Sequence, residues 1–220
     1  MRRSLLASCL ALLTTSTFAA NVAISPTSLE ADVSSATQAI TLHNRGDTAL
    51  RYQVRAYRWT QANGEDVLTE SGDVLATPAI VEVPAKGRRV VRLMRLEGVG
   101  TIGYYRVLVH QLPAPKGAGA TDSNVSLLVH HSLPMAFEPR AADASLTVGP
   151  AATGYRFQNA GTTAARVTRL GPAVGAPWRQ GALGWVLPGM AKTIPLEPAH
   201  RAAVVSVTVN GTAQTLTVGP

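Results

Sequence analysis

The sequence predicts an all-β protein that folds as two β-sandwiches. Valine and threonine are plentiful, and apolar residues recur at every second position within short stretches, as they do on a strand with one buried face. Turn residues separate these stretches about every 8–12 residues, a spacing that is typical of sandwiches. No segment keeps a helical apolar period for three turns, which argues against helices.

The first half of the chain reads as strands joined by turns. Residues 38–59 read as strand, turn and strand, with Ile40 and Leu42 alternating before the turn. Asn63–Gly64 follows, a pair that tolerates the positive φ angles of a type I′ hairpin turn. Further strands are expected in the segments 88–96, 103–113 and 124–139.

A second series of strands follows a break near residues 138–145. Short strand patterns continue to the end of the chain, and Asn210–Gly211 joins the last two as a hairpin. Both halves contain the order strand, Asn-x-Gly turn, strand, which suggests two sandwiches of related design. We therefore place the two domains at residues 21–138 and 143–220.

The N-terminal residues predict export. A basic start at Arg2 and Arg3, a short apolar run and small residues up to Ala20 are typical of a secretory signal peptide over residues 1–20. A lipoprotein signal with the lipid on Cys9 is the alternative, although the apolar run before it is only a few residues long. Cys9 is the only cysteine, so we expect no disulfide and no thiolate metal site in the mature chain. No later segment is long enough to cross a bilayer.

The charge pattern argues against nucleic acid as a partner. The formal net charge of +7 falls to about +5 without Arg2 and Arg3, and the basic residues are scattered rather than gathered in a block with aromatic residues. A modest positive field toward an acidic partner is compatible with this charge.

The sequence gives no positive support for an enzyme, a cofactor or a metal site. It lacks Gly-x-Ser-x-Gly, phosphate-loop and dinucleotide-binding motifs. His43, His110 and His200 have no acidic or cysteine neighbours at the spacing of metal ligands. His130 and His131 are adjacent on a predicted strand, so their side chains face opposite ways and cannot chelate one metal ion.

The segment 124–139 raises the main functional question. Val125, Leu127 and Val129 fall on one face of a predicted strand, directly after a loop rich in Gly, Ala and Pro at residues 114–123. This apolar face is either ordinary core or a surface presented to another molecule.

Several segments together carry a resemblance that covers nearly the whole mature chain. They are AYRWTQANGEDV, ATPAIVEVPAKGRRVVRLMR, GYYRVLVHQLP and VSLLVHHSLPMAF in the first half and YRFQNAGTTAARVTRL in the second. In order and spacing they resemble the periplasmic pilus chaperones of the chaperone–usher pathway, and most closely the archaic or alternative branch that serves spore-coat-U-type subunits. The resemblance implies two immunoglobulin-like sandwiches in a boomerang arrangement.

The resemblance also implies a function and a set of site residues. Such chaperones lend the last strand of the first domain to a pilus subunit and deliver the subunit to an outer-membrane usher. The matching donor positions here are Val125, Leu127 and Val129, and no cofactor is implied. An open edge strand of this kind invites self-association. We therefore expect the free protein either to pair with a second copy through residues 124–132 or to keep the 114–124 loop and the start of the strand mobile.

One departure from the family concerns the subunit's terminal carboxylate. The best-known branch holds it with an Arg in the first strand and a Lys in the donor strand, but the matching positions here are Ser28 and Pro134. Because a carboxylate in a cleft favours a cationic fork, Arg92 and Arg106 are the candidate replacements. The alternative for both arginines is a structural ion pair that braces the sheet.

Two other functions stay open at this point. The first is a secreted two-domain β-sandwich structural or adhesive protein whose apolar strands are all used in its own core. The second is a carbohydrate-binding module, which the small number of aromatic residues disfavours.

Overall fold

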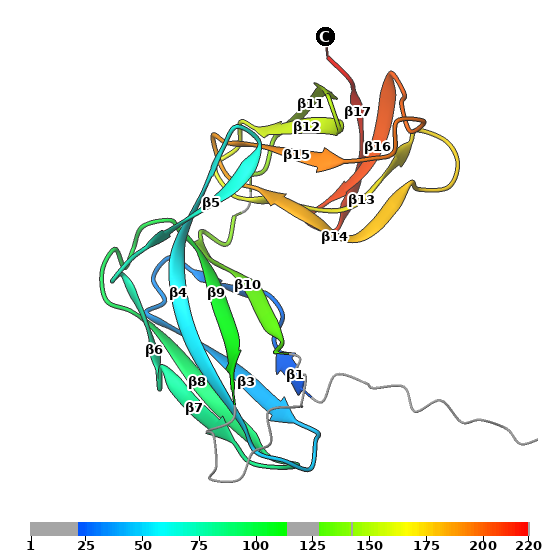
Figure 1. Ribbon diagram of the computed structural model, residues 1–220. Coiled ribbons are helices and arrows are strands. Elements are labelled where there is room, and N and C mark those ends of the chain that lie inside the picture. The colour runs from blue at the N-terminus through cyan, green and yellow to red at the C-terminus, as the bar shows by residue number, and fades with distance from the viewer. Residues whose placement is uncertain (1–21, 114–127, 142, 220) are drawn as a thin grey trace, which may run out of the picture.

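The computed structural model describes residues 22–113, 128–141 and 143–219. The expected signal peptide lies outside these residues, and so do two of the expected donor positions, Val125 and Leu127. All regular elements of the described residues are strands, and they form two β-sandwiches set at an angle to each other (Figure 1). No helix in the described part of the chain could therefore span a membrane.

The first sandwich packs two sheets face to face. One sheet has four strands in the order β1 (Val22–Ser25), β3 (Thr37–Asn44), β8 (Arg88–Arg95) and β6 (Val74–Thr77). The other has the order β2 (Leu29–Asp32), β10 (His130–Glu138), β9 (Gly103–Leu112), β4 (Leu50–Ala62) and β5 (Glu65–Glu70), and β7 (Ile80–Val83) also pairs with β4.

The second sandwich is smaller. Its first sheet has the order β11 (Leu146–Ala151), β12 (Gly154–Asn159) and β15 (Ala191–Pro195). Its second sheet has the order β14 (Arg179–Val186), β13 (Ala165–Pro172), β16 (Val204–Val209) and β17 (Thr212–Thr217). The two-sandwich, all-β fold expected from the sequence is confirmed.

Each sandwich encloses its own apolar core because inward positions alternate along the strands. On β9, for example, Tyr105, Val107 and Val109 are buried, while the residues between them face outward. The first core also gathers Ile40, Leu42, Tyr52, Val54, Val91, Leu93, Met135 and Phe137. The second core gathers Tyr155, Phe157, Val167, Leu170, Val186, Ile194, Val205 and Val207.

Both Asn-Gly pairs form the hairpin turns expected from the sequence. Asn63 and Gly64 have φ angles of 54° and 84° between β4 and β5. Asn210 and Gly211 have φ angles of 50° and 85° between β16 and β17. Positive φ at both central residues is the requirement of a type I′ turn, which the Asn-Gly pair meets at little cost.

A third apolar cluster joins the two sandwiches. Its buried members are Trp59 and Ala136 from the first sandwich and Ala164, Trp185 and Leu187 from the second. The rings of Trp59 and Trp185 are tilted by 48° with their centroids 5.8 Å apart. This contact fixes the position of the cleft between the sandwiches, where the candidate site lies.

Candidate functional site

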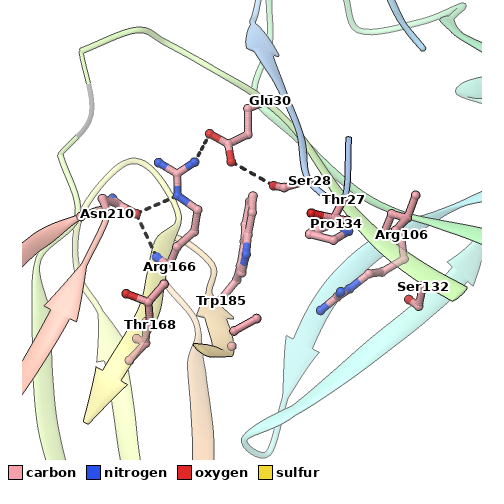
Figure 2. A pocket seen from close by; sticks show the side chains of 15 residues that line it. Thr27, Ser28, Glu30, Arg106, Ser132, Pro134, Arg166, Thr168, Trp185 and Asn210 are labelled. Atoms are coloured by element: carbon pink, nitrogen blue, oxygen red, sulfur yellow. Dashed lines mark hydrogen bonds and ion pairs between the residues drawn. The ribbon is translucent and has the colours of Figure 1, made fainter. Parts of the chain in front are cut away.

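A cavity of about 670 Å³ lies between the two sandwiches (Figure 2). The first sandwich contributes residues from β2, β9 and β10, and the second contributes residues from β13 and β14 and from the turn between β16 and β17. The polar groups that face the cavity include Ser28, Glu30, Arg106, Arg166 and Asn210.

Arg106 projects into this cavity from the outward face of β9. Its guanidinium carbon lies 3.9 Å from the centroid of the Trp59 ring, and its Nη2 is 3.2 Å from Oδ2 of Asp66. The side chain is only 17% exposed. Burial lowers the pKa of Arg106, and the charge of Asp66 opposes that change. Arg106 is thus a desolvated cation held in one position by a ring and a carboxylate.

Asp66 is held by both sandwiches. Its Oδ1 accepts a hydrogen bond from Nε2 of Gln61 at 2.9 Å and lies 2.9 Å from Nζ of Lys192 on β15. Burial acts to raise the pKa of this carboxyl, but the hydrogen bonds from Gln61 and Lys192 outweigh it and hold the pKa below its ordinary value. Asp66 therefore stays ionised at neutral pH and links the two sandwiches.

Arg166 faces the same cavity from β13 of the second sandwich. Its guanidinium carbon lies 5.4 Å from the centroid of the Trp185 ring, and its Nε donates to Oδ1 of Asn210 at 3.0 Å. Its Nη1 forms an ion pair with Oε2 of Glu30 on β2. In Figure 2, Trp185 lies between Arg166 and Arg106. Two arginines, each seated on one of two packed tryptophans, thus line one cavity.

The sequence did not single out Arg166. It belongs to a segment that carried the resemblance, but its role depends on how the second sandwich is placed against the first. The local pattern places Arg166 on the face of β13 opposite Val167 and gives no information about that placement.

Arg92 lies in a different part of the molecule. It sits on β8 in the other sheet of the first sandwich, opposite Ala39 and Thr77, and it is exposed. Of the two candidates for carboxylate binding, only Arg106 lines the cleft.

The start of β10 is an open strand edge. β10 pairs with β9 from His130 onward, whereas on its other side β2 pairs only with Met135–Glu138. Among the described residues, no strand pairs with the free side of residues 130–134. Backbone N–H and C=O groups on such an edge can bind a further strand.

Val129 lies immediately before this open edge. The backbone N–H of Gln111 donates to the carbonyl of Val129 at 3.2 Å, so Val129 continues the pairing with β9. By strand alternation Val129 lies on the same face as Leu133 and Met135, which is the core face. The other two expected donor positions, Val125 and Leu127, lie outside the described residues.

The two adjacent histidines face opposite ways, as the sequence predicted. His130 is exposed and packs edge-on against His110 of β9, with ring centroids 4.6 Å apart. His131 lies opposite Val109, and its Nε2 is buried without a hydrogen-bond partner among the residues that the structure describes. Burial, and then the charges of His130 and Arg55, lower the pKa of His110. Within the described residues, no group of three or more metal-binding side chains is present.

Comparison with known proteins identifies a family. Residues 21–143 match the family described as "Pili and flagellar-assembly chaperone, PapD N-terminal domain". None of the curated proteins matches the chain.

Solved structures of the same fold cover nearly the whole chain. The complex of CsuC with the tip adhesion subunit CsuE from the archaic chaperone–usher Csu pili of Acinetobacter baumannii has a TM-score of 0.69 and 19% identity, covering 90% of this chain and 98% of that chain. The Salmonella enterica SafA pilin in complex with the SafB chaperone has a TM-score of 0.66 and 15% identity, covering 93% of this chain and 98% of that chain. The Pseudomonas aeruginosa chaperone CupB2 has a TM-score of 0.62 and 16% identity, covering 90% of this chain and 100% of that chain. At these identities the likeness concerns the fold.

Proposed function

The chain belongs to the family of pili and flagellar-assembly chaperones, and from this premise we propose that it holds pilus subunits in the periplasm by donor-strand complementation and passes them to an outer-membrane usher. The observation that carries the proposal is the open edge of β10, which leads into a cleft lined by two arginines. Two of the similar structures are complexes of a chaperone with a pilin or tip subunit, which supports pilus subunits as partners. We propose that, within this family, the chain belongs to the archaic branch.

The donor strand supplies two kinds of interaction. Its free backbone edge pairs with a strand of the subunit, each hydrogen bond contributing about 0.5–1.5 kcal/mol. Val125, Leu127 and Val129 fill apolar pockets of the subunit, at about 1.5–3 kcal/mol for each buried side chain. The loss of translational and rotational freedom on association offsets part of this gain. In the free protein the same edge is open to pairing with a second copy.

The cleft supplies the electrostatic part. We propose Arg106, rather than Arg92, as the residue that binds the subunit's terminal carboxylate, with Arg166 as a second cation on the other side of the cleft. Partial burial strengthens a charge-assisted hydrogen bond to such a carboxylate, and a guanidinium offers it two parallel donors. The proposed function requires no covalent chemistry and no cofactor.

The donor strand is tested with two neighbouring substitutions. The chaperone is co-expressed in the periplasm with a pilus subunit from its own gene cluster, and the subunit that co-purifies is measured. Val129→Asp should reduce co-purification about tenfold or more, because a carboxylate in an apolar pocket is not solvated. Leu128→Asp is the matched control, since Leu128 lies on the opposite face of the strand, and it should co-purify normally.

Melting curves of both variants separate the alternatives. If Val129→Asp folds and co-purifies like Leu128→Asp, this strand does not bind the subunit. If Val129→Asp fails to fold while Leu128→Asp folds, the apolar face belongs to the protein's own core. A secreted structural or adhesive protein then becomes the better description.

A further inference from the structure

We infer that in the free chaperone Glu30 forms the ion pair with Arg166 that the subunit's terminal carboxylate takes over when the subunit binds. This inference rests on the proposed function, because it concerns the same cleft. It assigns Glu30 as an internal competitor that sets how tightly the cleft holds a carboxylate.

Both arginines of the cleft already have an acidic partner. Arg106 pairs with Asp66, and Arg166 pairs with Glu30. A carboxylate from a subunit can therefore gain a guanidinium only by sharing one of these pairs or by replacing its acid. The two acids differ in how firmly they are held.

Asp66 is the acid that is held firmly. Besides Arg106, it has Gln61 and Lys192 as partners, each at 2.9 Å, and its side chain is 27% exposed. Its release would leave two cations and an amide without their acceptor in a partly buried site, which is costly.

Glu30 is the acid that is held weakly. Within the described residues, the carboxylate of Glu30 has one other hydrogen bond besides its pair with Arg166, from Oγ of Ser28 at 2.9 Å. Its side chain is 43% exposed, so water can solvate the carboxylate as soon as it swings away. Exposed ion pairs contribute little, and replacing Glu30 is accordingly the cheaper exchange.

Arg166 keeps its position without Glu30. Oδ1 of Asn210 accepts hydrogen bonds from both the backbone N–H and Nε of Arg166, at 2.9 Å and 3.0 Å. The ring of Trp185 lies beneath the guanidinium. These contacts use the inner part of the side chain, so the terminal nitrogens stay available to a new carboxylate.

The test compares peptide binding by three proteins. A fluorescein-labelled peptide with the last residues of a pilus subunit is made with a free or an amidated C-terminus and is titrated with wild type, Glu30→Gln and Glu82→Gln. Glu82 is an exposed acid on β7 that does not line the cleft, so its substitution changes the net charge equally. Glu30→Gln should bind the free-acid peptide about three- to fivefold more tightly than the other two proteins. All three should bind the amidated peptide equally and weakly.

A double substitution links the effect to Arg166. In an Arg166→Gln background, Glu30→Gln should give no gain in affinity, because the two residues act as one pair. Melting curves of all variants show whether each protein is folded at the temperature of the titration.

The outcomes separate this inference from the proposed function. If wild type prefers the free-acid peptide but Glu30→Gln gains no affinity, or gains it even without Arg166, the inference is wrong while the carboxylate site stands. If wild type and Glu30→Gln do not distinguish the two peptides, the carboxylate site itself is wrong, and the inference falls with it.

Discussion

Two buried asparagines show how single residues hold each sandwich together. Asn44 donates from Nδ2 to the carbonyl four residues further on and accepts at Oδ1 from the backbone N–H two residues further on. Asn159 does the same in the second sandwich, and its Nδ2 also donates to the carbonyl of Val186. Because both asparagines are nearly inaccessible to water, these backbone groups depend on the amide for their hydrogen bonds.

The substitution Asn159→Asp should destabilise the second sandwich by about 2 kcal/mol or more. An ionised carboxylate cannot donate to the two carbonyls that the amide now satisfies, and it carries a charge into a buried site. Gln158→Glu is the matched control, since the neighbouring side chain is exposed and undergoes the same chemical change. Thermal unfolding of the two variants at neutral pH is the measurement. Equal melting temperatures would show that the Asn159 hydrogen bonds are not needed for stability.

Single residues also mark the limit of what the sequence predicts. The shared Asn-x-Gly pattern was visible in both halves because it acts within a few residues of its own turn. The pair of Arg106 and Arg166 was not visible, because the two residues meet only when two separately folded sandwiches are set side by side. The local pattern predicts which face of each strand is buried. The cleft, by contrast, depends on the contact between Trp59 and Trp185, which forms only between the two sandwiches.

At the scale of elements, the β4–β5 hairpin contacts β15 and so helps join the two sandwiches. Figure 1 shows it reaching from the first sandwich toward β15 of the second. The carbonyl of Gly64 at its tip accepts a hydrogen bond from the backbone N–H of Thr193 at 3.0 Å. The sequence predicted this hairpin from Asn63–Gly64, but not its partner, because the turn signal carries no information about a distant strand.

The two turn glycines offer a matched pair of substitutions. An alanine Cβ at Gly64 would lie 2.5 Å from Oγ1 of Thr193, whereas one at Gly211 would meet no atom within 4 Å. Both positions have positive φ, so both variants should lose about 1–2 kcal/mol from backbone strain alone. Gly64→Ala should in addition make the orientation of the two sandwiches relative to each other more variable. Small-angle X-ray scattering measures this change.

A second change tests the cause of the loosening. Adding Thr193→Ala to Gly64→Ala removes the crowded hydroxyl and should restore part of the wild-type scattering profile. If Gly64→Ala and Gly211→Ala scatter alike, the hairpin tip does not set the angle between the sandwiches.

At the scale of the whole molecule, the cleft depends on the same contacts that hold the sandwiches together. The side chain of Gln61 donates to the carbonyl of Trp185 at 2.7 Å, accepts from the backbone N–H of Leu187 at 3.0 Å and donates to Asp66. Asp66 in turn fixes Arg106 and binds Lys192 of the second sandwich. The interface therefore orients Arg106 in the cleft, and the geometry of the cleft depends on the ionised carboxylate of Asp66.

This dependence predicts an effect of pH on stability. The pKa of Asp66 in the folded protein lies below the ordinary value of 3.8, so its contribution to stability is fully present above that value and is lost as the pH falls through the folded pKa. Asp66→Asn should be less stable than wild type at pH 7 by about 2 kcal/mol, because Lys192 and Arg106 lose their anionic partner. Below about pH 4 the gap between the two proteins should shrink, because protonation brings wild type to the same neutral state.

Denaturant unfolding of both proteins between pH 7 and pH 3 measures this gap. Glu65→Gln is the control, since Glu65 is an exposed neighbour whose substitution changes the net charge equally, and its gap from wild type should stay near zero throughout. A gap that stays constant down to pH 3 would show that the charge of Asp66 does not stabilise the interface. Arg106 would then be held in place by its packing on Trp59 rather than by the charge of Asp66.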